Sequence, residues 1–306
     1  LAETTTDRKR RYGTSQDAQM TRLDEMGSVA TEKTRVGDTV EFPMFKHGRS
    51  IGWTADFLAQ ATPADLAKAQ IATQKAYPAQ HRAEIRRAIF LSSNYTVEDE
   101  FVDGVELSVK RLVNADGAAI PNNQNNESFD GATHTHYDAE DFSTASAADK
   151  NTAVRSLIDD VVEHDHGENV RLYINRAQEE EVMALADFTK YEDPRIIFRN
   201  SDTPAETLDL SRRNHRAIGI IGAAEVGVKP WVPAGYMLAF AAGGDERPLV
   251  RRVHPTFGGG LRLTGEHRDY PLQADQYVAY FGFGVWVRTN GAVLYTGGAA
   301  YQDPAL

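Results

Sequence analysis

From residue 216 to its end the chain is a succession of short apolar runs separated by turn residues, which restricts this third to β structure. The runs cover residues 217–226, 231–241, 248–253, 261–263 and 277–288. Asn290 and Gly291 separate the last of them from the run 292–295, and an Asn-Gly pair between hydrophobic runs is a strong signal for a tight β-hairpin. We therefore expect antiparallel strands here, with the last two joined through this pair.

A long helix is predicted over residues 63–90. Thr62, Pro63 and Asp65 supply an N-cap, a first-turn proline and a capping-box carboxylate. Pro78 has no amide hydrogen to donate inside a helix, so we expect the helix to be split into two pieces there.

A second helix is expected after Ser146, which can form a capping box with Asp149, and it should end at Gly167. Its apolar residues recur at helical spacing on one face: Val154, Leu157, Ile158, Val161 and Val162. Strands are predicted at 105–110 and 170–174, a short helix at 178–188 and an exposed loop at 114–130. Helices interleaved with antiparallel strands indicate an α+β fold.

Residues 34–57 predict a long β-hairpin. Their β-branched and aromatic residues fall in two runs, 36–45 and 50–57, with a polar stretch at 46–49 as the tip. An isolated two-stranded ribbon is marginally stable in water, so this one is expected to lie on a surface of its own chain or of a neighbour.

The charge is unevenly distributed and the chain contains no cysteine. The net charge is −11, and residues 96–169 hold seventeen acidic and four basic residues. The missing cysteines exclude disulfides, thiolate metal ligands and a cysteine nucleophile. No apolar run is long enough to span a membrane. The chain starts at Leu1 without an apolar segment after it, so no signal peptide is expected.

A compact basic cluster is formed by Arg8, Lys9, Arg10 and Arg11. We interpret it as part of a solvated arm, while contact with nucleic-acid phosphates remains the functional alternative.

Motifs for catalysis are absent, and only histidines suggest a site. The sequence has neither a phosphate-binding loop nor a Gly-x-Ser-x-Gly elbow; Gly282 and Gly284 lie in a predicted strand, where their small size would let another backbone approach. His134 and His136 share one face of an extended segment with Asp138 and Glu140, and His164, Asp165 and His166 form a second group. Together they could bind zinc or iron. The alternative, which the sequence favours, is that His164 complements a helix C terminus and that no metal, cofactor or catalytic site exists.

Five segments resemble major capsid proteins of tailed bacteriophages. They are 105–117 (VELSVKRLVNADG), 131–137 (GATHTHY), 229–237 (KPWVPAGYM), 248–252 (PLVRR) and 280–295 (YFGFGVWVRTNGAVLY). The resemblance implies the Hong Kong ninety-seven type fold: an N-terminal arm at 1–33, an extended β-hairpin loop at 34–61, a peripheral domain with a spine helix at 62–145, an axial domain at 146–270 and returning strands at 271–306.

The same resemblance implies a structural, non-enzymatic role in a virion. Its partners would be copies of itself in hexamers and pentamers of an icosahedral shell, packaged double-stranded DNA, and portal, scaffold and decoration proteins, with assembly in the host cytoplasm and no membrane contact. Two alternatives remain: an encapsulin-type compartment shell, and a soluble metalloenzyme that uses His134, His136 and nearby acids.

Some shells of this family are cross-linked between a hairpin lysine and an asparagine. Lys46 lies at the expected hairpin tip, and asparagines are available at Asn94, Asn114, Asn122 to Asn126 and Asn290, among others. A lone lysine without an identifiable pocket favours a solvated ion-pairing role, so we expect no cross-link.

Overall fold

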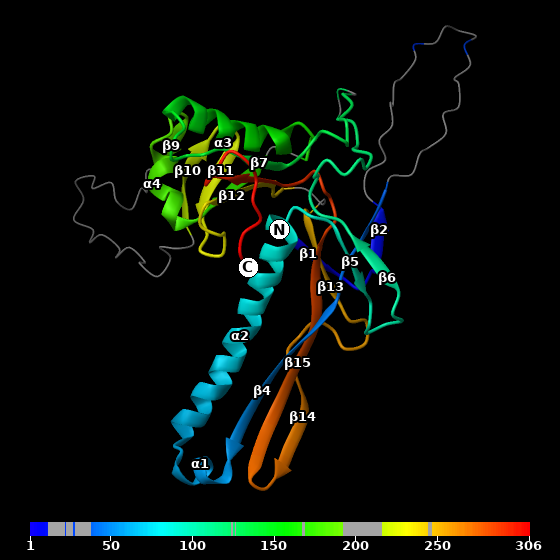
Figure 1. Ribbon diagram of the computed structural model, residues 1–306, viewed down its shortest axis with the longest axis vertical. Helices are drawn as coiled ribbons and strands as arrows, with labels where there is room; N and C mark the ends of the chain where they lie inside the picture. Colours follow the sequence, from blue (N-terminus) through cyan, green and yellow to red (C-terminus); the bar gives the residue numbers. More distant parts are fainter. Residues whose placement is uncertain are drawn as a thin grey trace, which may run out of the picture.

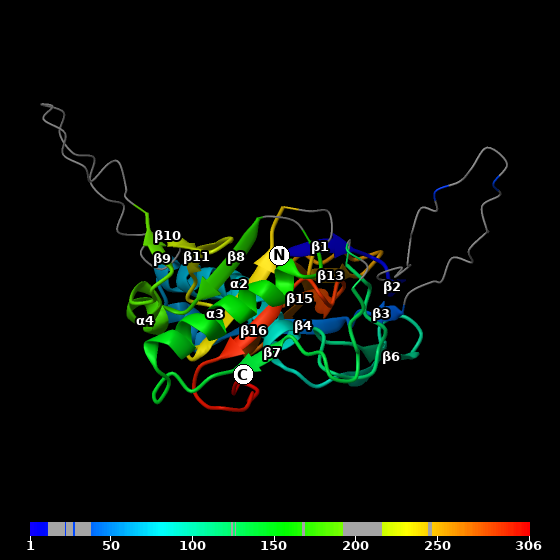
Figure 2. The same cartoon turned by 90° about the horizontal axis from the view of Figure 1, so that it is seen from above.

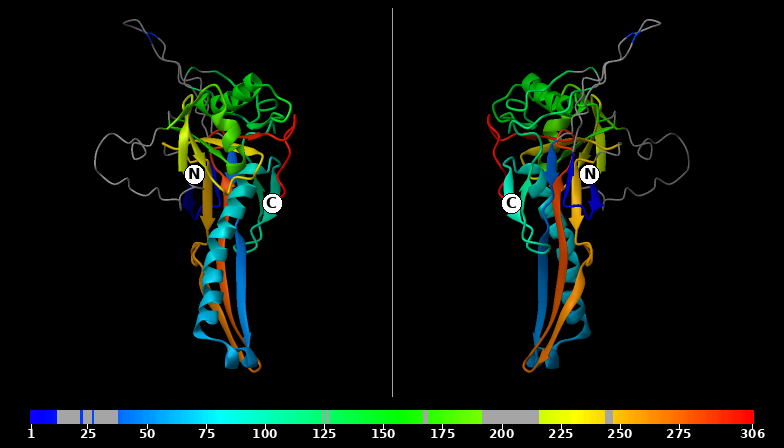
Figure 3. Two further views of the ribbon diagram at one scale, coloured as in Figure 1. Left: turned by 90° about the vertical axis from the view of Figure 1, so that its left-hand side faces the viewer. Right: turned by 90° about the vertical axis from the view of Figure 1, so that its right-hand side faces the viewer.

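The molecule consists of a body of sheets and helices from which one long limb extends (Figure 1). The computed structural model describes residues 1–11, 22, 27, 38–123, 125, 127–166, 169–191, 216–243 and 247–306. Seen edge-on, the limb is thin compared with the body (Figure 3). Among the described helices, none has the length and apolar composition required to cross a bilayer.

The limb and its base are built on one sheet, whose central strand is β15. β4 pairs with residues 272–281 of β15 along one edge, while β14 and β13 occupy successive parts of its other edge. β1 adds to β13 in parallel. The strands are β1 (Ala2–Thr5), β4 (Phe45–Thr54), β13 (Leu249–Val253), β14 (Arg262–Asp269) and β15 (Leu272–Val285).

The long helix α2 (Pro63–Phe90) lies along this sheet, and the short helix α1 (Ala55–Gln60) caps the far end of the limb (Figure 1). The capping box of Thr62 and Asp65 is confirmed. The expected split at Pro78 is wrong, because α2 continues through it as one helix. Side chains on both sides of the proline hold the helix to the sheet: Tyr77 receives a hydrogen bond from Arg251, and the His81 ring stacks on Phe281. These contacts offset the one backbone hydrogen bond that Pro78 cannot make.

A second, seven-stranded sheet forms most of the body. Its order is β7-β16-β12-β8-β11-β10-β9, and α3 covers one face, as the view from above shows (Figure 2). The strands are β7 (Tyr137–Ala139), β8 (Val170–Ile174), β9 (Phe188–Lys190), β10 (Arg216–Ile221), β11 (Ala224–Val228), β12 (Tyr236–Ala241) and β16 (Ala292–Tyr295); the helices are α3 (Ala147–Val162), the 3₁₀ turn η1 (Arg176–Gln178) and α4 (Glu179–Met183). The predicted α+β class is confirmed, as are the Ser146 capping box and the strand 170–174.

Strand β12 is buried on both faces and separates two cores. Met237 and Ala239 face the core under α3, whereas Leu238 and Phe240 face a core shared with the limb sheet and the end of α2. This second core includes Ile89 and Phe90 of the helix and Phe281, Phe283 and Val285 of β15. The limb is therefore packed onto the body through apolar side chains.

The hairpin expected over 34–57 is wrong where the structure describes it. Residues 46–49, the expected tip, lie inside β4, whose partner is β15 and not a nearby strand. β3 (Thr39–Glu41) instead pairs with β2 (Lys9–Arg11), while Val36 lies outside the described residues. The strand predicted at 105–110 is confirmed as β6 (Glu106–Val109), which pairs with β5 (Tyr95–Glu98).

The hairpin predicted at Asn290 and Gly291 is also wrong, because β15 and β16 belong to different sheets. The Asn290 side chain is buried, and its Oδ1 accepts a hydrogen bond from the Ala241 amide at 2.8 Å. Asn290 thus stabilises the segment between β15 and β16, where the chain passes from the first sheet to the second. The two sheets also do not divide at residue 146, where we expected the peripheral domain to end and the axial domain to begin. β7, which comes before this residue, joins the second sheet, while β13 and β14, which come after it, join the first.

The close approach expected at Gly282 and Gly284 is confirmed. A Cβ on Gly282 would lie 2.2 Å from the Pro43 carbonyl oxygen, and one on Gly284 would lie 2.7 Å from the Phe42 ring. Only glycine permits the chain before β4 to cross β15 this closely.

Candidate functional site

The far end of the limb carries exposed apolar side chains. Tyr270 is 86% exposed in the turn between β14 and β15, and Leu272 follows at the start of β15. Phe57 on α1, at the same end, is also exposed, and so are Ile71 on α2 and Leu263 on β14, farther along the limb. Exposed apolar side chains gathered on a protruding element are typical of a contact surface, because burial against a partner would remove them from water.

The first residues of the chain are attached to the base of the limb through buried charges. Asp99 is fully buried and accepts from Arg252 at 2.6 Å and from Arg8 at 3.1 Å. Arg252 also donates to the Phe42 carbonyl oxygen at 2.9 Å, and Arg8 reaches Asp103. One carboxylate thus joins the N-terminal segment to the limb sheet.

Two residues of the basic cluster point toward the protein and two point toward solvent. The interpretation of the cluster as part of a solvated arm therefore fits only the second two. Arg8 and Arg10 point inward: Arg10 pairs with Glu3 and Asp7 and lies 4.7 Å from the Trp286 ring centroid. Lys9 and Arg11 alternate with them along β2 and are exposed. The remaining part of the expected arm, 12–33, falls almost entirely outside the described residues.

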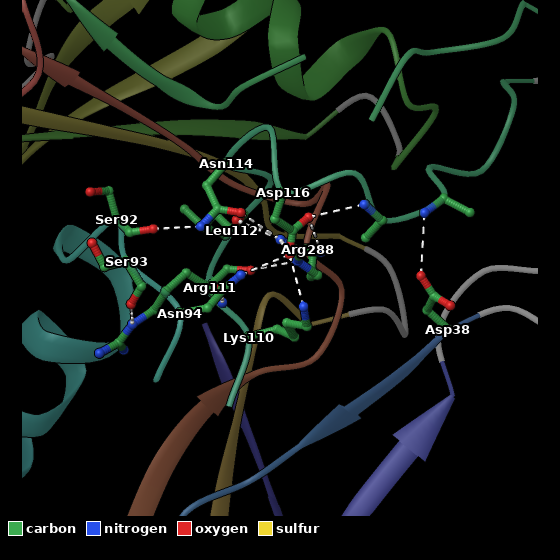
Figure 4. A network of polar contacts seen from close by, with 12 residues as sticks. Asp38, Ser92, Ser93, Asn94, Lys110, Arg111, Leu112, Asn114, Asp116 and Arg288 are labelled. Atoms are coloured by element: carbon green, nitrogen blue, oxygen red, sulfur yellow. Dashed lines mark hydrogen bonds and ion pairs between the residues drawn. The ribbon is translucent and has the colours of Figure 1, made fainter. Parts of the chain in front are cut away.

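The connection between the two sheets is held by Arg288, which lies between β15 and β16 and is almost fully buried (Figure 4). Its guanidinium crosses to the segment after β6. It donates to the carbonyl oxygens of Arg111 at 2.7 Å and Leu112 at 3.3 Å, to Asn114 Oδ1 at 2.9 Å, and to both carboxylate oxygens of Asp116 at 3.1 Å.

Asp116 is the anionic centre of this network. Asn94 Nδ2 donates to it at 2.7 Å and Lys110 Nζ at 3.0 Å. Burial raises the pKa of Asp116, but the charge and hydrogen bonds of Arg288, together with Lys110, hold it well below its usual range. The carboxylate therefore stays ionised, and the junction is a set of satisfied polar groups around the buried guanidinium of Arg288 that fixes one arrangement of the sheets.

The structure brings three of the predicted histidines together and leaves the other candidates out. His134, His136 and His164 converge with Glu163, which the sequence analysis missed. The sequence signal that could have identified Glu163 was its position next to His164 at the end of the predicted helix. The carboxyl of Asp138 is paired with that of Asp160, and burial together with this neighbour raises the pKa of Asp160.

The other members of the predicted clusters serve elsewhere. His166 interacts with Thr289 Oγ1 at 2.6 Å, and Glu140 and Asp165 are not part of the converging group. His164, expected to serve only a helix terminus, is instead buried against two other imidazoles.

Lys46 is not at a hairpin tip. It lies within β4, opposite Tyr280 of β15, with its ammonium 5.8 Å from that tyrosine ring centroid. Its side chain is exposed, and the expectation that it forms no cross-link stays a prediction.

No protein-family model matches this sequence, and neither does any curated protein. Solved structures do match. A structure of Mycobacterium phage Patience is similar over 99% of this chain and 84% of its own, with a TM-score of 0.70 and 20% identity. The capsid of the native GTA particle matches over 97% of this chain and 88% of its own, with a TM-score of 0.52 and 14% identity. The capsid of Cyanophage P-SCSP1u matches over 96% and 86%, with a TM-score of 0.52 and 10% identity.

The chain has the capsid-protein fold. This confirms the Hong Kong ninety-seven type fold that the sequence resemblance implies. At these identities the likeness concerns the fold, and the role of each surface has to be argued from the residues of this chain.

Proposed function

We propose that this chain is the major capsid protein of a tailed phage and that its copies tile an icosahedral shell around double-stranded DNA. The observation that carries the proposal is a likeness to a phage-type capsid structure over 97% of the chain, combined with a limb that ends in exposed apolar side chains. A monomer gains nothing from such a limb, whereas a neighbouring copy would bury it. The role is structural and non-enzymatic.

In this proposal the limb with α2 is the peripheral domain, and the seven-stranded sheet with α3 is the axial domain. The shell is part of the virion and assembles in the host cytoplasm. Scaffold, portal and decoration proteins are its further partners.

The proposal predicts large assemblies of the purified chain. We expect rings or closed shells of megadalton size by analytical ultracentrifugation and negative-stain microscopy, because the contacts between copies contribute to stability by mass action. A chain that stays monomeric at every salt and protein concentration would contradict the proposal. Particles that hold an enzyme cargo and lack DNA would instead identify an encapsulin-type compartment.

A second prediction concerns the exposed half of the basic cluster. If β2 faces the packaged DNA, the double variant Lys9→Gln, Arg11→Gln should form normal shells but release DNA at lower salt, because two phosphate contacts are lost. The matched variant Arg8→Gln, Arg10→Gln removes the same charge but breaks the pairs with Asp99, Glu3 and Asp7, so it should lower the unfolding temperature. DNA retention is measured by dye accessibility during a salt titration. Identical behaviour of the two variants would show that the cluster has no DNA-facing side.

A further inference from the structure

Three imidazole nitrogens meet at one point between the loop before β7 and the end of α3. His134 Nε2 lies 3.1 Å from His136 Nε2 and 3.1 Å from His164 Nε2, and the last two are 3.2 Å apart. A tetrahedral zinc site with Zn–N bonds of about 2.0–2.1 Å places its nitrogen ligands about 3.3–3.4 Å from one another. The three nitrogens thus have nearly the spacing that a tetrahedral ion requires.

A backbone contact of His136 fixes which of its two ring nitrogens carries the proton. The Nδ1 of His136 lies 2.8 Å from the Gly291 carbonyl oxygen, which can only accept, so Nδ1 carries the proton and Nε2 of the neutral ring presents a lone pair. His136 is fully buried and His164 is buried as well, so both imidazoles are shielded from water. A neutral imidazole is the form that binds metals.

Glu163 supplies a fourth ligand atom. Its Oε1 lies 3.2 Å from His134 Nε2 and 3.6 Å from His164 Nε2, and this buried oxygen accepts no hydrogen bond from any residue that the structure describes. The Phe129 ring packs 4.3 Å from the His164 ring and 5.1 Å from that of His134, between centroids, and covers the group.

We propose that His134, His136, Glu163 and His164 bind one Zn²⁺ ion as a structural site. Three imidazoles and a carboxylate are ligands that Zn²⁺ accepts, and the Gly291 carbonyl orients His136 in the way that outer partners orient ligating histidines. Four protein ligands close the coordination sphere, so the site is structural, unlike a catalytic site with an open position. The ion ties the end of α3 to the segment entering β7, next to the crossing between the two sheets. This inference does not depend on shell formation.

The test uses the full, untagged chain, treated with a chelator and then supplied with Zn²⁺ or Co²⁺ alone. We expect about one equivalent of Zn²⁺ per chain by elemental analysis, the intense visible spectrum of tetrahedral Co²⁺, and a rise of about 5 °C in unfolding temperature with excess Zn²⁺. The double variant His134→Gln, Glu163→Gln should lose all three responses, with binding at least 100-fold weaker. His166→Gln, which changes a neighbouring histidine outside the group, should keep them.

His134 and Glu163 are chosen because both are partly exposed, whereas a change at fully buried His136 could prevent folding. Circular dichroism shows whether each variant is folded. A folded wild-type chain that takes up no more Zn²⁺ or Co²⁺ than the double variant, or a His166→Gln variant that loses binding equally, would overturn the proposal.

Discussion

Arg288→Met should lower the free energy of unfolding by about 3–5 kcal/mol, because it removes the donor side of a buried ionic network. The carbonyl oxygens of Arg111 and Leu112 would each lose a partner in a buried position, and the side chain of Asn114 would lose one in a partly buried position. Asp116 would keep Asn94 and Lys110, so part of the network survives. The loss is measured by urea unfolding followed by tryptophan fluorescence.

Two further variants show whether geometry or charge is responsible. Arg288→Lys keeps the charge but offers one ammonium in place of a planar fork, so we expect an intermediate loss. Arg155→Met removes an arginine paired with Asp187 at the surface and should cost less than about 1 kcal/mol. A loss at Arg288 no larger than at Arg155 would mean that the junction is held by apolar packing alone.

The same network predicts how this effect depends on pH. The pKa of Asp116 is lower in the folded chain than in the unfolded chain. Its contribution to the free energy of unfolding is therefore fully present above the pKa of the unfolded chain, about 4, and is lost progressively as the pH falls from there through the folded pKa. The difference between wild type and Arg288→Met should therefore shrink below about pH 4.

Sequence patterns correctly predicted the helices and strands that are determined by neighbouring residues in the chain. The capping residues Thr62 and Ser146 start helices as expected, and the apolar run 170–174 is a strand of the second sheet. The family resemblance led to the correct fold, because ordered residue patterns carry topology that periodicity alone does not.

The failures share a cause, which is that identical local patterns serve different tertiary roles. Nothing in β4 itself indicates that its partner is β15, more than two hundred residues later. Asn290 has the composition of a turn, yet its amide group pairs with the backbone of Ala241 in a buried crossing. Pro78 remains inside a helix because side chains around it bind the limb sheet.

The histidine group shows the same limit. The pair His134 and His136 could be recognised from its spacing, but its meeting with Glu163 and His164 depends on how α3 packs across the second sheet. The spacing of His134 and His136 predicts that these two ligands lie on one face. Glu163 and His164 join them only because the end of α3 packs beside this segment.

The largest effect on assembly is expected at the far end of the limb. The double variant Tyr270→Ser, Leu272→Ser should reduce the yield of closed particles at least tenfold, while the isolated subunit keeps its stability within about 0.5 kcal/mol because both side chains are exposed. Burying one such side chain against a neighbouring copy contributes about 1.5–3 kcal/mol. Because the double variant removes two of them from each contact, the association constant of that contact should fall by about two to four orders of magnitude. Sedimentation velocity gives the particle fraction, and urea unfolding reports the subunit stability.

Val162→Ser provides the matched control, because Val162 is 41% exposed on α3, at the opposite end of the molecule from the limb tip (Figure 1). It makes a comparable apolar-to-polar change and should leave the particle yield within a factor of about two, as expected for a surface change that touches no contact. If the limb variant forms shells of normal size at normal yield, the exposed residues at its end do not bind a neighbouring copy, and the contacts between copies must lie on the body. If instead the limb variant loses subunit stability, Tyr270 and Leu272 support the turn between β14 and β15. The particle yield of Phe57→Ser, a change on α1 outside that turn, then decides whether this end of the limb is a contact between copies.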